Sequence, residues 1–291
     1  MCLLCFIRGG SLALEETFEM KKIRLIALDI DGTLLDDKKK LPQENREALA
    51  EAAAQGVVVA IASGRMTPTI EPVAELLGLD CVIIAYNGGK VVAPRKAGRT
   101  VLHHEPVPSE VSDIFVKFAH EKGHLLNFYH EERLYGQEGL RQRQFMEIYS
   151  SRTGAQYQIE KDLTRFYGVQ PTKLILMGDP PELDELCVSF RESLDCKAYI
   201  TKTDPEYLEV MAPGVDKGSA LPVMAAHYGF TVDEVLAVGD ANNDVGMLRA
   251  AGIGVAVQNA GPRAKASADV VTQSTNNESA VAEAIRRWVL S

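Results

Sequence analysis

Short apolar runs rich in Val and Ile alternate with helical segments in two separate parts of this chain. The first part contains IRLIALDI, VVVAIASG and CVIIAYNGG, and the second contains EVLAVGD and IGVAV. Continuously apolar strands that alternate with helices are typical of a mostly parallel sheet with both faces covered. The sequence therefore predicts a doubly wound α/β core that is assembled from residues 21–89 and 211–291.

The intervening residues 90–210 follow a different pattern. Most of the Tyr and Phe residues lie here, and runs such as HLLNFYHEERLYG and YLEVMAP alternate apolar with polar side chains. This pattern indicates an inserted α+β domain whose sheet has one solvated face. Its borders carry Asn87-Gly88-Gly89 and Pro213-Gly214, which favour hinges, although Asn-Gly by itself also predicts a tight hairpin turn.

The charge balance excludes two classes of partner. The chain has 40 acidic and 31 basic residues among 291, and its net charge is -9. Nucleic acids and anionic membrane surfaces are bound by clustered cations, which this sequence lacks. No apolar run approaches the length of a transmembrane helix. We therefore expect a small-molecule partner, neither nucleic acid nor membrane, and the sequence indicates no particular oligomeric state.

Residues 1–20 stand apart from the repeating pattern. Their apolar run is too short for a signal peptide, so we expect a disordered extension or the product of an upstream start. Cys2 and Cys5 lack the second pair of ligands that a structural zinc site needs. Cys81 lies in an apolar strand, where a small buried side chain is expected. The odd total of five cysteines favours a reducing cytoplasm over a disulfide framework.

Polar residues cluster where the predicted parallel strands end. In a doubly wound sheet, ligands bind at the carboxyl ends of the strands, and these ends lie at one edge. The residues predicted to share that edge, together with a lysine that begins the preceding helix, are Asp29, Asp31, Gly32, Thr33, Ser63, Gly64, Arg65, Lys217, Asp240, Asn243 and Asp244.

This set of side chains suits a phosphoryl group held beside a hard cation. Several carboxylates without His or Cys form an oxygen-rich site, for which Mg²⁺ is the usual ion where phosphate is also bound. Ser63, Lys217, Asn243 and the backbone N–H groups around Gly32 and Gly64 can donate to phosphate oxygens. One carboxylate can form an aspartyl-phosphate while a neighbouring one transfers protons to and from the leaving oxygen and water.

Four segments in order, DIDGTLL, IASGR, GVDKG and VGDANNDVGML, resemble the four motifs of the haloacid dehalogenase-like phosphatase superfamily. The insert between the second and third motifs resembles the C2B cap of the Cof-type branch. The resemblance covers residues 22–291. Departures at Val257-Gln258 and at Glu278 to Val281 lie outside the four motifs and leave the implied chemistry unchanged.

The resemblance implies a role for each motif residue. Asp29 would be the nucleophile and Asp31 the general acid and base. Mg²⁺ would be held by Asp29, the backbone carbonyl of Asp31 and Asp240, with Asp244 as a ligand or as an acceptor through water. Phosphate would be bound by Ser63, Lys217 and Asn243, with Lys217 also neutralising charge beside Asp29. Arg65 could contact the substrate or close a salt bridge beside the cleft.

The implied activity is a Mg²⁺-dependent phosphatase that hydrolyses small soluble phosphoesters through an aspartyl-phosphate. Sugar phosphates are the commonest substrates of this branch, and flavin mononucleotide and pyridoxal phosphate are further candidates. The alternatives are a phosphomutase of the same fold and a non-catalytic phospholigand sensor. The cap residues that could contact the leaving group are Tyr129, Arg133, Tyr135, Tyr207 and Glu209.

Two further strings carry no functional prediction. HEKGH, at residues 120–124, matches a zinc-protease motif, which requires both histidines on one helix. Gly123 predicts a helix end between them, so the two rings should diverge. The run DKKK, at residues 37–40, is expected to be a solvated cluster of charges.

Overall fold

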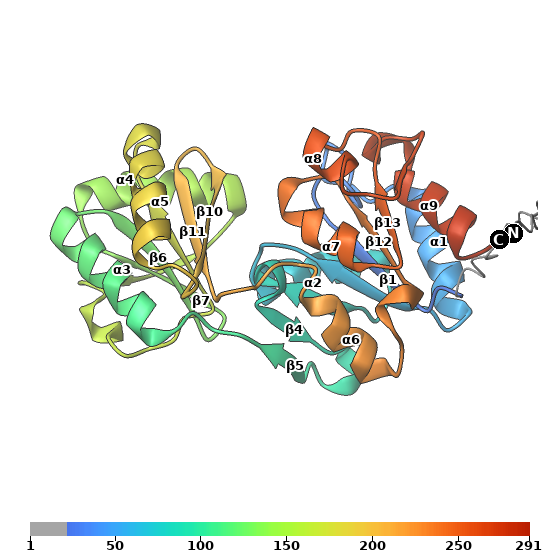
Figure 1. The fold of residues 1–291 in the computed structure, drawn as a ribbon, viewed down its shortest axis with the longest axis horizontal. Helices are drawn as coiled ribbons and strands as arrows, with labels where there is room; N and C mark the ends of the chain where they lie inside the picture. The colour runs from blue at the N-terminus through green and yellow to red at the C-terminus, as the bar shows by residue number, and fades with distance from the viewer. Residues whose placement is uncertain (1–21) are drawn as a thin grey trace, which may run out of the picture.

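The computed structural model describes residues 22–291, which form two parts connected by two stretches of chain (Figure 1). We refer to these parts as the core and the cap. The predictions for residues 1–20, including those for Cys2 and Cys5, lie outside the described residues. Cys81 is buried, as its apolar surroundings predict.

The core contains an eight-stranded sheet with the order β14-β13-β12-β1-β2-β3-β4-β5. The strands are β1 (Leu25–Asp29), β2 (Val58–Ala62), β3 (Val82–Ala85), β4 (Lys90–Val92), β5 (Val101–His104), β12 (Val235–Gly239), β13 (Ile253–Ala256) and β14 (Val270–Val271). The six strands from β14 to β3 are parallel, whereas β4 and β5 are antiparallel additions at one edge. The predicted doubly wound α/β core is confirmed.

The strand pairing corrects the predicted boundary of the cap at residue 90. Strands β4 and β5 follow residue 89 but hydrogen-bond to the core sheet, so the cap sheet begins only with β6 (Leu125–His130). Short antiparallel edge strands have the same alternating composition as a cap sheet, which is why the sequence pattern misplaced them. Asn87-Gly88-Gly89 forms the tight turn between β3 and β4, so the hairpin interpretation is the one observed.

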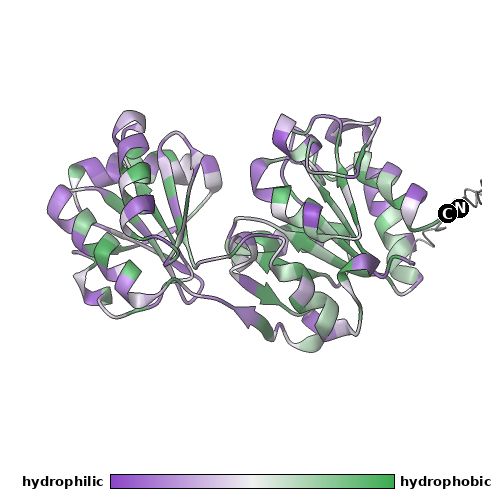
Figure 2. Ribbon diagram, in the orientation of Figure 1, coloured by the Kyte–Doolittle hydropathy of each residue, from purple (hydrophilic) through white to green (hydrophobic). Residues whose placement is uncertain are grey.

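Helices pack on both faces of the core sheet. The core helices are α1 (Gln43–Ala54), α2 (Thr67–Leu77), α6 (Ala220–Tyr228), α7 (Val245–Ala250), α8 (Pro262–Lys265) and α9 (Ala280–Trp288). Helices α1 and α9 pack against each other on one face, and α7 contacts β12 and β13 on the other (Figure 1). The enclosed strands are hydrophobic and the outer helix surfaces are polar (Figure 2), as burial of both sheet faces requires.

The cap is an α+β domain with the strand order β10-β11-β9-β6-β7-β8. Its remaining elements are α3 (Ser109–Lys122), β7 (Arg133–Gln137), α4 (Leu140–Thr153), β8 (Tyr157–Glu160), β9 (Lys173–Met177), α5 (Pro180–Ser193), β10 (Tyr199–Asp204) and β11 (Tyr207–Met211). One face of the sheet packs against α3 and α5, with Phe115 of α3 and Phe190 of α5 in the buried contact.

The second face of the cap sheet is not solvated, contrary to the prediction. Its side chains include Tyr129, Lys173, Tyr207 and Glu209, all of which are buried. These residues line a cavity that also contains residues of the core. Helix α4 covers part of this face through Tyr149, and the rest faces the core across the cavity, so its polar residues do not meet bulk water.

The HEKGH string has the structure that was predicted for it. Helix α3 ends at Lys122, and Gly123 follows with φ 70° in the left-handed conformation. His124 is buried and faces the carbonyl of Met177 at 3.3 Å, whereas His120 is exposed on α3. The two histidines thus belong to different surroundings and do not form a zinc site.

Candidate active site

The carboxyl ends of β1, β2 and β12 form the floor of the candidate site. Strand β1 lies between β2 and β12 in a parallel arrangement, with Asp29 paired in register with Ala62. The chain leaves β2 at Ser63 and leaves β12 at Asp240. The three strand ends therefore bring Asp29, Ser63 and Asp240 to the same edge of the sheet, as the sequence predicted.

Lys217 lies beneath this edge as a fully buried cation. Its Nζ atom lies 2.5 Å from Asp29 Oδ1 and 2.6 Å from Asp244 Oδ1. Burial lowers the pKa of Lys217, but the charges of Asp244 and Asp29 outweigh this effect and hold the pKa above its ordinary value. Lys217 does not line the cavity. The structure places it against the carboxylates and gives it no direct access to the cavity.

The carboxylates outnumber the buried cation. Asp29, Asp240 and Asp244 each place an oxygen within 4.8 Å of the others, and the ammonium of Lys217 pairs with Asp29 and Asp244. Burial raises the pKa of Asp29 well above its ordinary value, and the charge of Asp244 adds to the rise. Such crowding disfavours three ionised carboxylates unless further positive charge is supplied.

These residues fit a divalent cation. Asp29 Oδ2 is buried and has no hydrogen-bond partner within residues 22–291, so this oxygen can serve as a ligand. Asp244 Oδ2 accepts from the backbone N–H groups of Asp240 and Ala241, and its Oδ1 accepts from Lys217. Both oxygens of Asp244 are therefore engaged, which suits the predicted role of an acceptor more than that of a direct ligand.

A turn at Gly32 directly follows the two aspartates of the first motif. Gly32 has φ 86°, and a Cβ atom there would lie 2.6 Å from Asp240 Oδ2, so a larger residue would displace that carboxylate. Thr33 donates to Asp240 Oδ1 at 2.9 Å. Gly32 therefore packs against the Asp240 carboxylate, and it does not line the cavity where phosphate binding was predicted.

Asp31 is held by two cations on the cavity wall. Lys39 donates to Asp31 Oδ1 at 2.8 Å, and Arg65 donates to Asp31 Oδ2 at 2.5 Å. Burial raises the pKa of Asp31, but the Lys39 hydrogen bond and the Arg65 charge prevail, and the pKa lies below its ordinary value. Its carboxylate is not part of the triad formed by Asp29, Asp240 and Asp244. The prediction that the 37–40 run is only a solvated charge cluster is therefore wrong for Lys39.

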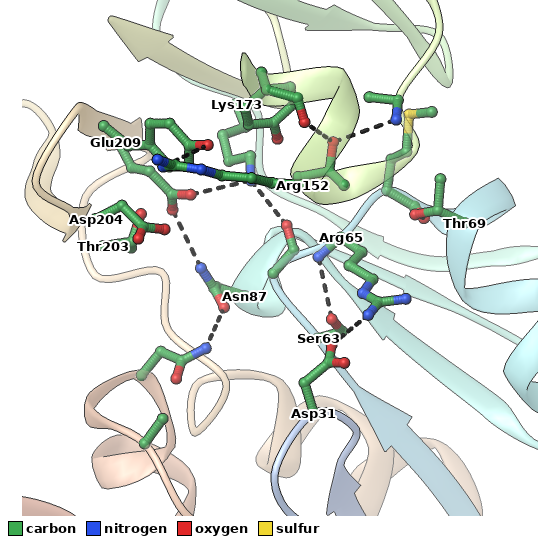
Figure 3. Close-up of a pocket in the computed structure, with 18 of the residues that line it drawn as sticks. Asp31, Ser63, Arg65, Thr69, Asn87, Arg152, Lys173, Thr203, Asp204 and Glu209 are labelled. Atoms are coloured by element: carbon green, nitrogen blue, oxygen red, sulfur yellow. Dashed lines mark hydrogen bonds and ion pairs between the residues drawn. The ribbon is translucent and has the colours of Figure 1, made fainter. Parts of the chain in front are cut away.

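Three of the five residues predicted to bind phosphate border a cavity of about 420 Å³ between the core and the cap (Figure 3). Ser63, Gly64 and Asn243 line it, as do Asp29, Asp31 and Arg65. Ser63 Oγ accepts from the backbone N–H of Arg65 at 3.2 Å. Arg65 forms an ion pair with Asp31, so the salt-bridge alternative is observed. Because Arg65 also lines the cavity, contact with the substrate stays a prediction.

The cap supplies the opposite wall of the cavity. Tyr129, Tyr207 and Glu209 line it as predicted, whereas Arg133 and Tyr135 do not. Residues that the sequence interpretation missed are Lys39, Met66, Thr69, Asn87, Tyr149, Arg152, Thr153, Ala155, Lys173, Thr203, Asp204 and Ala241. Asn87 could have been found by the rule already used, because it follows the carboxyl end of β3. The others carry no comparable signal.

One protein family matches nearly the whole of the described chain. Its sequence model, described as haloacid dehalogenase-like hydrolase, covers residues 26–285. A 5-amino-6-(5-phospho-D-ribitylamino)uracil phosphatase of Bacillus subtilis is 33% identical over 270 residues, which are 92% of this chain and 96% of that protein. The HMP-PP phosphatase of an Enterobacter species is 29% identical over 240 residues, which are 82% of this chain and 86% of that protein.

Solved structures agree with the sequence comparison. A haloacid dehalogenase-like hydrolase from Bacteroides thetaiotaomicron has a TM-score of 0.81 and 30% identity, covering 91% of this chain and 99% of its own. A protein from Thermotoga maritima also has a TM-score of 0.81 and 30% identity, covering 91% of this chain and 97% of its own. Among residues 22–291, no helix is long and apolar enough to cross a membrane.

Proposed function

The chain belongs to the haloacid dehalogenase-like hydrolases, and on this premise we propose that it is a Mg²⁺-dependent phosphatase of small phosphomonoesters. The observation that carries the proposal is Oδ2 of Asp29, which has no hydrogen-bond partner within residues 22–291. Asp29 belongs to the carboxylate triad with Asp240 and Asp244 and lines the cavity. A nucleophilic carboxylate needs a free oxygen, and a divalent cation needs an acidic cluster with little competing charge.

In the proposed reaction, a carboxylate oxygen of Asp29 attacks phosphorus and the bond to the leaving oxygen breaks. Asp31 gives that oxygen a proton, so an alcohol departs and an aspartyl-phosphate remains. Water then attacks the phosphorus, Asp31 takes its proton, and the bond from phosphorus to Asp29 breaks to release phosphate. Mg²⁺, held by Asp29, the Asp31 carbonyl and Asp240, would neutralise the phosphoryl oxygens.

Lys217 and Asn243 complete the proposed site. The Nζ atom of Lys217 lies 2.5 Å from Asp29, and its charge opposes the rise in the pKa of Asp29, which favours the ionised form that acts as a nucleophile. Ser63, Asn243 and the backbone at Gly64 line the cavity as donors for the transferred phosphoryl group. Arg65 and Lys39 add positive charge on the side of the cavity that receives the phosphate.

The substrate is proposed to be a small phosphorylated metabolite. A cavity of about 420 Å³ accommodates a sugar phosphate and a part of a larger molecule such as flavin mononucleotide or pyridoxal phosphate. The two curated relatives are named as phosphatases of phosphorylated small molecules, which supports this class. A phosphomutase or a phospholigand sensor of the same fold is the alternative.

The proposal is tested by phosphate release from a panel of small phosphoesters with Mg²⁺ and with EDTA. We expect release only with Mg²⁺, and we expect Asp29→Asn to abolish it because the variant lacks the nucleophile. Asp195→Asn, at an exposed cap position, is the matched control and should retain activity. Binding of a phosphoester without turnover would contradict the proposal and favour the sensor, whereas isomerisation dependent on a bisphosphate would favour the mutase.

A further inference from the structure

A chain of polar groups connects the cap to the phosphate side of the core. The carboxylate of Glu209 contacts Lys173 Nζ through Oε1 at 3.3 Å and accepts from Asn87 Nδ2 through Oε2 at 3.4 Å. Asn87 Oδ1 in turn accepts from Asn243 Nδ2 at 3.1 Å (Figure 3). We call Lys173, Glu209, Asn87 and Asn243 the interdomain bridge.

Three of the four bridge residues are buried, and the bridge is anchored at both domains. Lys173, Glu209 and Asn87 are 3%, 6% and 9% exposed, respectively, so none of them relies on bulk water for its hydrogen bonds. Lys173 also donates to the carbonyl of Gly64 at 2.8 Å, and the Asn87 N–H donates to the carbonyl of Ser63 at 2.9 Å. The cap therefore contacts the phosphate-side residues directly when the bridge is formed.

The charge of Glu209 determines the orientation of both amides in the bridge. An ionised carboxylate only accepts hydrogen bonds, so Asn87 must turn its NH₂ group toward Glu209. The Asn87 carbonyl oxygen then faces Asn243, which must present its own NH₂ group in return. One N–H of Asn243 is used by Asn87, and the second remains available to a ligand in the cavity that Asn243 lines.

Gly64 leaves room for the Asn87 amide in this arrangement. A Cβ atom at Gly64 would lie 3.0 Å from Asn87 Oδ1 and 3.1 Å from its Nδ2, so the amide packs directly on the glycine. The Asn87 backbone has φ 52°, a left-handed conformation that asparagine tolerates better than most residues. The position thus requires both the backbone freedom and the amide of asparagine.

We infer that Glu209 and Asn87 are positioning residues, which orient the Asn243 amide toward phosphate only while the cap is seated on the core. This inference rests on the proposed function, because it assigns the free N–H of Asn243 to the phosphoryl group. Contact between the cap and the core is therefore coupled to phosphate binding. When Glu209 loses its contact with Asn87, no carboxylate fixes which side of each amide, the oxygen or the NH₂ group, faces its neighbour.

The test uses inorganic phosphate as the probe, because phosphate has no leaving group that Glu209 could contact. Binding of phosphate to the full chain with Mg²⁺ is measured by calorimetry, alongside kcat and KM for a small phosphomonoester. Glu209→Gln keeps the shape of the side chain, but its amide can donate as well as accept. We expect phosphate to bind about tenfold more weakly, which corresponds to one hydrogen bond to a charged group.

Glu132→Gln is the matched control at the same interface. Glu132 is a second cap carboxylate that contacts the core, but its partners are Thr67, Tyr86 and Lys90 and include no bridge residue. This variant should leave phosphate affinity unchanged. Equal weakening by both variants would show that cap docking in general, and not amide orientation, controls phosphate binding, and the inference would be overturned.

Asn87→Gly provides an independent variant that keeps the Lys173–Glu209 pair. Glycine accepts the positive φ, so the turn should fold without the amide. We expect the same loss of phosphate affinity as for Glu209→Gln. When either change is combined with Asn243→Ala, the double variant should bind phosphate as tightly as Asn243→Ala alone. Additive losses would contradict a route through Asn243.

The outcomes separate this inference from the proposed function. Wild-type protein that neither binds phosphate nor hydrolyses any phosphoester overturns the proposed function, and the inference with it. Wild-type protein that hydrolyses phosphoesters while Glu209→Gln binds phosphate as tightly as before overturns the inference alone.

Discussion

The ammonium group of Lys217 lies 2.5 Å from Oδ1 of Asp29, and its side chain is completely buried. It is also 2.6 Å from Asp244, so one lysine compensates two buried carboxylates. Replacing it by Met would leave both carboxylates without a cation in a site from which water is largely excluded.

We therefore expect Lys217→Met to lower the free energy of unfolding by about 3–5 kcal/mol, as removal of one partner of a buried ion pair does. Activity should also fall, because the pKa of Asp29 would rise further. Urea unfolding and steady-state kinetics measure the two effects. Lys202→Met is the control: its partner Asp184 is mostly exposed, so a loss of no more than about 1 kcal/mol is expected. Similar losses for both variants would contradict the argument.

Lys39 should control the pH dependence of the reaction through Asp31. A general acid must be protonated, so activity should decline as pH rises through the pKa of Asp31. Lys39 and Arg65 hold this pKa below its ordinary value despite burial. Lys39→Met removes a cation that favours the carboxylate, so the pKa should rise and the declining limb of the kcat profile should move to higher pH. Lys38→Met, at an exposed neighbouring position, should leave the limb in place; a shift in both variants, or in neither, would exclude this role.

Magnesium should stabilise the fold as well as support activity. A cation among Asp29, Asp240 and Asp244 relieves the repulsion between these neighbouring carboxylates. A ligand at a hundredfold excess over its Kd stabilises the folded state by about 2.7 kcal/mol. We expect Mg²⁺ to raise the Tm and EDTA to reverse the increase. Asp240→Asn should abolish the increase, whereas Asp195→Asn should retain it; a Tm that does not respond to Mg²⁺ in the wild type would argue against a site in the triad.

Gly88 lies where the β3–β4 turn meets the segment that precedes Lys217. It has φ 100°, and a Cβ atom there would lie 2.0 Å from the carbonyl oxygen of Asp216. Gly88→Ala should therefore destabilise the protein by about 3 kcal/mol or more, because backbone must move. Gly98 has φ 72°, but a Cβ atom there would have no neighbouring atom within 4 Å. Gly98→Ala should therefore lower the free energy of unfolding by only about 1 kcal/mol. Thermal or urea unfolding compares them, and equal losses would show that strain, not contact, dominates.

The floor of the site was predictable because its residues obey local rules. Asp29, Ser63 and Asp240 follow directly after apolar strands, and parallel strands bring their carboxyl ends to one edge whatever the rest of the chain does. The resemblance of four short motifs to one family added the roles proposed for these residues. The edge strands β4 and β5 were misplaced because an alternating pattern does not state which sheet a strand joins.

The sequence by itself determined the alternating strands and helices, the insertion between the two core segments and the acidic edge of the sheet. Only the tertiary structure decided that Lys39 reaches Asp31, and that Glu209 meets Asn87 from a segment 122 positions away. The physical reason is that strands and turns follow from nearby residues, whereas contacts between two domains depend on how their packed surfaces fit. The hydrogen bonds across that interface join residues that lie far apart in the chain, so the sequence does not show which residues will meet.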